Sequence, residues 1–168
     1  SQKRMILRLK IFVYNLFVIK LKWWLMMNFN NLVRSQIKNP KTIPIIIINF
    51  NQLFYLRQLV DFLQRRKFEN IIIVDNLSTY SPLLEYYKTL KGVTVEYMDQ
   101  NYGHKVFYEN KSLQKKYGQG FYVVTDADIN FYPDMPSDFM DVLLSLLNKH
   151  RQIVTKVGFA LNIDDIPD

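Results

Sequence analysis

Two uninterrupted runs of β-branched residues constrain the fold most strongly. Residues 43–49 read IPIIIIN and residues 71–75 read IIIVD. This composition is typical of strands that are buried on both faces, as in parallel sheets covered by helices on each side. Between the two runs, Leu56, Val60 and Leu63 recur at helical spacing. The sequence therefore predicts alternating strands and helices.

The same alternation continues to the end of the chain. Further strands are predicted over 93–98, 121–125 and 153–161, and a helix is predicted over 104–117. Three polar residues are predicted to cap helices, because their side chains can accept hydrogen bonds from the first free amides: Asn51, Ser81 and Ser137. This order predicts an α/β, Rossmann-like fold, with a mostly parallel sheet and helices on both faces.

Short polar groups follow four of the predicted strands. Ligands of such sheets bind outside the carboxyl ends of the strands, so these groups are the candidate binding residues. They are Asn49, Phe50 and Asn51 after the first strand, Asp75 and Asn76 after the second, Asn101, Gly103 and His104 after the third, and Asp126 and Asp128 after the fourth.

Asp126 and Asp128 are candidate metal ligands. At a spacing of two along an extended chain their carboxylates share a face, where they repel each other unless a cation lies between them. Mn²⁺ and Mg²⁺ prefer oxygen ligands, and Mg²⁺ is usually held by one or two carboxylates together with substrate phosphates. The alternative is a loop that begins with turn-forming aspartates.

Three further residues each have two interpretations. Asp75 could accept a hydrogen bond from the imide of a uracil ring, or it could cap the loop that follows it. Gly103 could allow the backbone to approach a ligand closely, or it could serve a turn. His104 could donate to a phosphate, or it could cap the next helix; for His104 alone the cap is favoured.

Taken together, residues 43–168 resemble the nucleotide-binding half of the family 2 glycosyltransferases, which have the GT-A fold. The matching motifs are IPIIIINFN, IIIVDNLST, the NYGH turn and VVTDADI. Two loops depart from the commoner pattern: Asn49-Phe50 stands where Thr/Asn-Tyr is usual, and Asp75-Asn76 stands in place of a pair of acids.

The resemblance implies an inverting hexosyltransferase that moves a sugar from a nucleotide diphosphate donor, such as a UDP-sugar, to a saccharide or lipid-linked acceptor. The loop from Asn49 to Asn51 would line the base and ribose, and Asp75 would meet the base. The turn from Asn101 to Gly103 would lie near the nucleotide. Asp126 would lie near the ribose or the metal, and Asp128 would bind Mn²⁺ or Mg²⁺ directly.

Inversion also needs a general base that deprotonates the acceptor hydroxyl. In the family this base lies well downstream, in a region that also binds the acceptor, and we expect that region to be missing here. Asp164 and Asp165 are the remaining acidic pair, either as candidates for the base or as part of a turn before Pro167. The alternative function is a catalytically incomplete module that binds a nucleotide sugar or serves as a scaffold.

Charge is distributed unevenly along the 168 residues. Residues 1–41 hold nine Lys and Arg and no acid, whereas the remainder holds 13 bases and 15 acids. We therefore expect no nucleic-acid partner for the body, residues 42–168. Residues 1–41 are predicted to form an apolar basic helix and a linker over 35–42. This helix either lies in a membrane surface or packs on the body or on a partner, and the protein is expected to be cytoplasmic or at the cytoplasmic membrane face.

The composition excludes several classes of site. The chain has no cysteine, which rules out disulfide scaffolds, thiolate-bound zinc and thiol catalysis. It has two histidines, so a metal site made of three histidines cannot form. No glycine-rich dinucleotide motif follows the first predicted strand, which argues against a dehydrogenase.

Overall fold

The computed structural model describes residues 14, 17–18, 20–129, 131–132, 134–151 and 153–159. The chain divides into two compact units. One unit is Asn30–Ser137, and the other combines Ser1–Phe29 with Asp138–Asp168. The larger unit contains the sheet and is described first.

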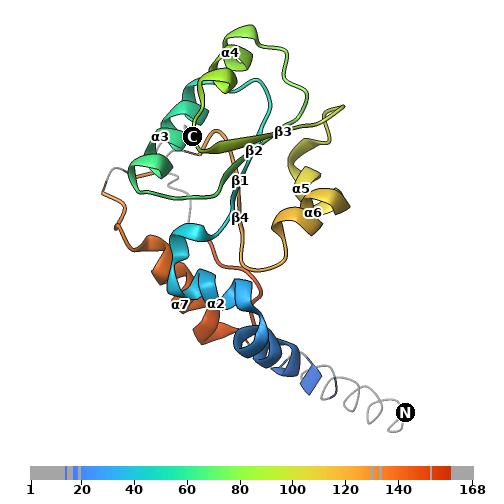
Figure 1. Ribbon diagram of the computed structural model, residues 1–168, viewed down its shortest axis with the longest axis vertical. Helices are drawn as coiled ribbons and strands as arrows, with labels where there is room; N and C mark the ends of the chain where they lie inside the picture. The colour runs from blue at the N-terminus through green and yellow to red at the C-terminus, as the bar shows by residue number, and fades with distance from the viewer. Residues whose placement is uncertain are drawn as a thin grey trace, which may run out of the picture. The chain divides into compact units, whose positions relative to one another are not determined.

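The sheet has four parallel strands in the order β3-β2-β1-β4 (Figure 1). The strands are β1 (Ile45–Asn49), β2 (Ile71–Asp75), β3 (Val93–Tyr97) and β4 (Val123–Asp126). Helices flank the sheet, so the predicted α/β, Rossmann-like class is confirmed. The predicted strand over 153–161 is wrong over its described part, because residues 153–159 form neither a strand nor a helix.

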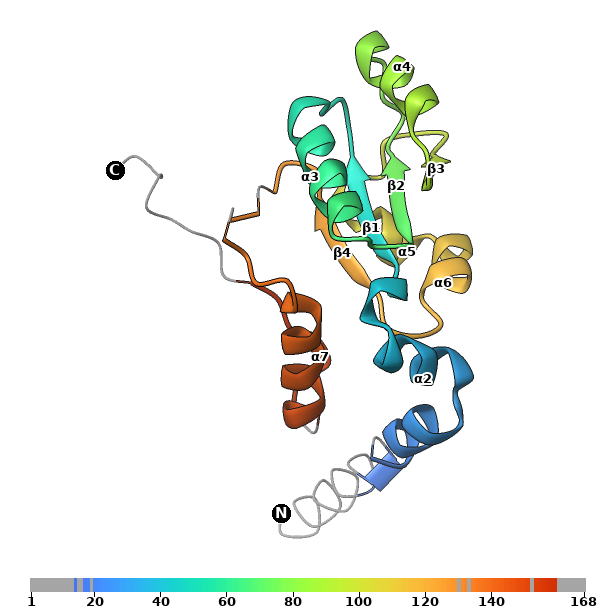
Figure 2. The same ribbon diagram turned by 60° about the vertical axis from the view of Figure 1, so that its left-hand side comes forward.

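The core lies on both faces of β1 and β2, all of whose residues are buried. On one face, Ile46 and Val74 belong to a cluster with Phe107 and Leu113, which come from α5 (Val106–Glu109) and α6 (Lys111–Tyr117). Helices α3 (Phe54–Arg65) and α4 (Ser81–Thr89) cover the other face (Figure 2). Each fully buried side chain of this kind contributes about 1.5–3 kcal/mol, which explains why the isoleucine runs become the central strands.

The predicted helix over 104–117 is interrupted. A short 3-10 helix, η2 (Gly103–Lys105), leads into α5, and the chain then turns at Asn110 before α6. The Asn110 side chain caps α6 by accepting hydrogen bonds from the backbone nitrogens of Ser112 (2.9 Å) and Leu113 (3.1 Å).

None of the three predicted caps acts as one. Helix α3 begins after Leu53 and not after Asn51. Ser81 is the first residue of α4, after Tyr80 at the cap position, and Asp138 precedes α7 (Phe139–His150) in place of Ser137. In all three helices the cap position makes no side-chain hydrogen bond, so the helix starts are set by packing and loop geometry.

Residues 35–38, which were predicted to belong to a linker, are helical. They lie in α2 (Asn31–Lys38), which is followed by the 3-10 helix η1 (Pro40–Thr42). The buried Gln36 side chain accepts from Phe121 N (2.8 Å) and donates to Phe121 O (2.8 Å), just before β4. These two bonds fasten α2 to the sheet, so the segment from Asn30 belongs to the same compact unit.

The second unit contains a helix over 20–29 and helix α7. Within the described part of the chain, neither of these helices nor any other is long and apolar enough to cross a membrane.

Candidate functional site

The carboxyl ends of the strands bring the predicted site residues to one edge of the sheet. The parallel register pairs Asn49 with Asp75, and Asp75 with Tyr97. On the other side of β1, Asp126 pairs with Ile48. Residues that are far apart in the sequence therefore begin their loops side by side, as expected for an α/β binding site.

A buried network of hydrogen bonds lies beneath this edge. Asn49 Nδ2 donates to the Tyr87 hydroxyl (2.7 Å), which in turn donates to Asp75 Oδ1 (2.8 Å). Asp75 Oδ2 accepts from Ser78 N (2.9 Å), so both carboxylate oxygens have a partner within the chain. Burial is the largest cause that raises the pKa of Tyr87. The hydrogen bond from Asn49 acts in the opposite direction, and the hydrogen bond to Asp75 adds to the rise, so the pKa lies well above its usual range. Tyr87 therefore stays protonated and keeps its role as the donor to Asp75.

Asn51 joins the loop after β1 to the loop after β2. Its backbone nitrogen donates to Ser78 Oγ (2.9 Å), and its Oδ1 accepts from the backbone nitrogens of Thr79 (2.8 Å) and Tyr80 (3.0 Å). Asn51 has a φ of 56°, a left-handed conformation that asparagine tolerates better than most residues. The neighbouring Phe50 ring is exposed at the edge.

Asn76 joins the loop after β2 to the turn after β3. Its backbone nitrogen donates to Asn49 O (2.9 Å), and its Nδ2 donates to Gly103 O (3.1 Å). Asn101 Oδ1 accepts from Gly103 N (2.8 Å), which closes the turn. Gly103 has a φ of 71°, a conformation that glycine adopts without steric cost. His104 follows in η2, is exposed, and makes no side-chain cap for that helix.

The two aspartates after β4 complete the edge. The strand ends at Asp126, and the chain turns at buried Ala127, whose nitrogen donates to Ile48 O (3.0 Å). Asp128 therefore lies in a turn and not on an extended strand, but both carboxylates are exposed. Burial, and then the charge of Asp128, raise the pKa of Asp126, while the charge of His104 acts in the opposite direction. The two carboxylates and His104 thus lie within electrostatic reach of one another.

These donors suit a divalent cation only if a ligand completes its shell. Among the described residues, no group of three or more His, Asp or Glu side chains could hold a metal ion. Two mutually repelling, exposed carboxylates fit Mn²⁺ or Mg²⁺ when phosphate oxygens supply further ligands. A divalent cation held by Asp126 and Asp128 would therefore need further ligands from outside this pair.

The predicted residues separate into a buried group and an exposed group. Asn49, Asp75 and Asn76 are buried and hold the loops together, whereas the exposed or half-buried side chains can meet a ligand: Phe50, Asn51, Asn101, His104, Asp126 and Asp128. Asp164 and Asp165 lie outside the described residues. Tyr87 is a site residue that was not predicted from the sequence. The spacing of four from Leu83 places both residues on one helix face, and a tyrosine on a buried face needs a hydrogen-bond partner.

Comparisons with known proteins give a distant likeness among solved structures. No family model matches the chain, and no curated protein matches it. Among solved structures, the chain is similar to residues 1–349 of TarS from S. aureus, with 20% sequence identity and a TM-score of 0.46. The likeness covers 66% of this chain and 33% of that one, so the chain spans about a third of the TarS structure. At this level of similarity, the likeness does not identify a function.

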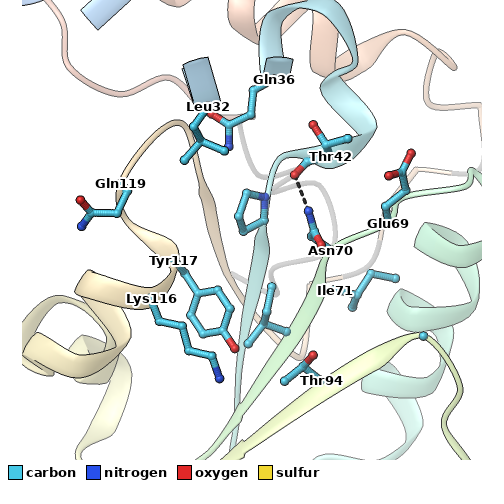
Figure 3. A pocket seen from close by; sticks show the side chains of 13 residues that line it. Leu32, Gln36, Thr42, Glu69, Asn70, Ile71, Thr94, Lys116, Tyr117 and Gln119 are labelled. Carbon is cyan, nitrogen blue, oxygen red and sulfur yellow. Dashed lines mark hydrogen bonds between the residues drawn. The ribbon is translucent and has the colours of Figure 1, made fainter. Parts of the chain in front are cut away.

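A cavity of about 300 Å³ lies at the opposite end of the strands (Figure 3). Residues near their amino ends line it, including Pro44, Asn70 and Thr94, together with Gln36 from α2 and Tyr117 from α6. Several of the polar lining groups are already bonded within the chain, as in the bond from Asn70 Nδ2 to Thr42 O (2.6 Å). None of the predicted site residues lines this cavity, so it is separate from the candidate site.

Proposed function

We propose that this chain is the donor-binding part of a metal-dependent inverting glycosyltransferase. Its donor would be a nucleotide diphosphate sugar, in the simplest case a UDP-sugar, and its acceptor a saccharide or a lipid-linked saccharide. The observation that supports this most is the convergence of four strand-end loops on one edge, where Asp126 and Asp128 are exposed. Hydrogen bonds through Asn51 and Asn76 tie three of these loops together.

In this proposal the exposed group binds the donor. Phe50 and Asn51 line the base and ribose, and the turn at Gly103 lets the nucleotide approach the backbone. His104 donates to a phosphate, while Asp126 and Asp128 hold Mn²⁺ or Mg²⁺ jointly with the phosphates. Such a cation, when bound, would neutralise charge on the diphosphate leaving group.

The buried group positions these loops. Asp75 is 1% exposed and both of its oxygens are bonded within the chain, so its first effect is on the loop from Ser78 to Tyr80. A direct contact of Asp75 with the nucleobase stays a prediction, and it requires this loop to move. Asn49 reaches the site in the same indirect way, through Tyr87.

In the transfer, the acceptor oxygen forms a bond to the anomeric carbon of the sugar. The bond from that carbon to the diphosphate oxygen breaks, and its electron pair leaves with the diphosphate. The proton of the acceptor hydroxyl passes to a general base. Asp164 and Asp165 stay candidates for that base.

Calorimetry with UDP, with and without Mn²⁺, tests donor binding. We expect Mn²⁺ to tighten UDP binding. Asp128→Asn should weaken the Mn²⁺-dependent binding by at least ~10–100-fold, which is the loss of metal affinity that removal of an outer-shell partner alone causes. The matched control is Asp134→Asn, which makes the same charge change at another exposed aspartate of the same unit. UDP affinity that is independent of Mn²⁺, or an equal loss in both variants, would contradict the proposal. Release of UDP from UDP-sugars in the presence of acceptor would separate an enzyme from a binding module.

A further inference from the structure

The helix over 20–29 exposes one apolar side to solvent. Its exposed large apolar residues are Leu21, Trp24, Leu25 and Phe29. At ~100° per residue they occupy an arc of about 140° on the helix. Phe17, which is also helical and exposed, precedes Leu21 by four positions, a spacing that belongs to the same face.

The rest of this helix has a different character. Trp23, Met26 and Met27 are half-buried, and helical spacing places them on the side opposite the exposed arc. Lys20 and Lys22 lie at the two borders, about 40° and 20° beyond the ends of the arc. The exposed apolar surface is therefore flanked by a positive charge on each side.

One polar residue, Asn28, falls inside the exposed arc. Its Nδ2 donates to Trp24 O (2.7 Å), so its amide group is partly satisfied within the helix. The Trp24 and Phe29 rings pack edge to face on the same side, with centroids 5.5 Å apart. This side of the helix can therefore be buried in an apolar medium without burying an unpaired charge.

We propose that this face docks on the surface of an anionic lipid bilayer, with the helix lying in the plane of the membrane. Tryptophan and flanking lysines are the residues that suit the headgroup region, where lysine side chains reach the phosphates while the apolar ones enter the acyl boundary. The charge of the segment agrees with this occupant, since residues 1–41 carry nine bases and no acid. The inference is independent of nucleotide binding.

The chain offers an internal probe, because Trp23 and Trp24 are its only tryptophans. Two variants of the full chain separate them: Trp23→Phe leaves Trp24 alone, and Trp24→Phe leaves Trp23. On vesicles of phosphatidylcholine with phosphatidylglycerol, we expect the emission of Trp24 to shift to the blue and to become protected from an aqueous quencher. The emission of Trp23, on the half-buried side, should change much less.

Charge and apolar contributions can be tested separately by co-sedimentation with the same vesicles. A lysine near an anionic surface contributes about 1 kcal/mol, so Lys20→Gln and Lys22→Gln should each weaken binding about fivefold, and Lys91→Gln should not. Leu25→Ser should weaken binding several-fold, whereas Leu146→Ser in α7 should not, although the two leucines are 44% and 42% exposed.

Three results would overturn the proposal. The first is equal binding to vesicles of phosphatidylcholine alone, which would show that binding does not need anionic lipid. The second is no shift and no co-sedimentation on either kind of vesicle. The third is protection of Trp24 that depends on protein concentration without lipid, which would make a second copy of the chain the occupant. In each case UDP binding should be unaffected, so failure here is distinguishable from failure of the proposed function.

Discussion

The Tyr87 hydroxyl donates a hydrogen bond of 2.8 Å to Asp75 Oδ1 while it accepts one of 2.7 Å from Asn49 Nδ2. One phenol on α4 thus joins the carboxyl ends of β1 and β2 beneath the candidate site. Since all three side chains are buried, the network fixes where the exposed loop residues lie.

Tyr87→Phe should lower the free energy of unfolding by about 1–3 kcal/mol, because it leaves Asp75 and Asn49 with buried groups that have lost their partner. Urea denaturation measures this change. The neighbouring Tyr86 is the control: its hydroxyl is buried and has no hydrogen-bond partner within the described part of the chain. Tyr86→Phe should therefore be close to neutral or stabilising. Equal losses in the two variants would show that the network does not stabilise the fold.

Substitutions at Asn51 separate its two roles. Asn51→Gly keeps the left-handed backbone but removes the hydrogen bonds to Thr79 N and Tyr80 N. Asn51→Ala removes the same bonds and adds a steric cost of about 1–2 kcal/mol. We expect both variants to bind UDP more weakly, and the alanine variant to be the less stable in thermal denaturation. An alanine variant as stable as the glycine variant would contradict the observed backbone conformation.

The pKa of Asp126 reports on the approach of the turn after β3 to the end of β4. Removing the charge of His104 by His104→Ala should raise this pKa further, and Asp128→Asn should lower it. His150→Ala, at the other histidine of the chain, should leave it unchanged. Because folding raises the pKa of Asp126, the contribution of this carboxyl to stability should fall as the pH rises from the ordinary pKa of aspartate to the raised value. A carboxyl-detected NMR titration measures these shifts, and no response to His104→Ala would place the turn elsewhere.

Glu96 on β3 binds Lys116 and Tyr117 on α6, and the hydrogen bond from Lys116 is the largest cause of the lowered pKa of the Glu96 carboxyl. The stabilisation is present above the ordinary pKa of glutamate and is lost as the pH falls through the lowered value. At neutral pH, Glu96→Gln should cost no more than about 1–2 kcal/mol, since Lys116 is largely exposed. The difference between the two proteins should vanish in acid. A constant difference from neutral to acid pH would mean that charge is not its cause.

The strands could be predicted from the sequence because their signal is local. Isoleucine runs fix β1 and β2, and the predicted strand over 71–75 has the observed bounds. The predicted strand over 153–161 does not form over its described part, where Lys156 and Gly158 interrupt the apolar residues. The break at Asn110 was missed because an apolar pattern continues through it, although asparagine is a good cap.

The site could be predicted only in outline. Polar residues at four strand ends identified the edge of the sheet, because parallel strands place their carboxyl ends together. Which of them would be buried could not be foreseen, because the burial of Asp75 depends on Tyr87, a residue 12 positions away on another element. Likewise, Asn51 looked like a cap for α3, but its tertiary contact with the loop before α4 determines its conformation.

Paramagnetic broadening of backbone amides by Mn²⁺ in the presence of UDP tests the central claim most directly, with Mg²⁺ as the diamagnetic reference. If the strand-end loops form one donor site, the amides of Asn51, Gly103, His104, Ala127 and Asp128 should broaden together. Those of Asn70, Gly92 and Thr94, at the cavity near the other end of the strands, should stay sharp. Broadening confined to a single loop, or broadening centred on that cavity, would contradict the account.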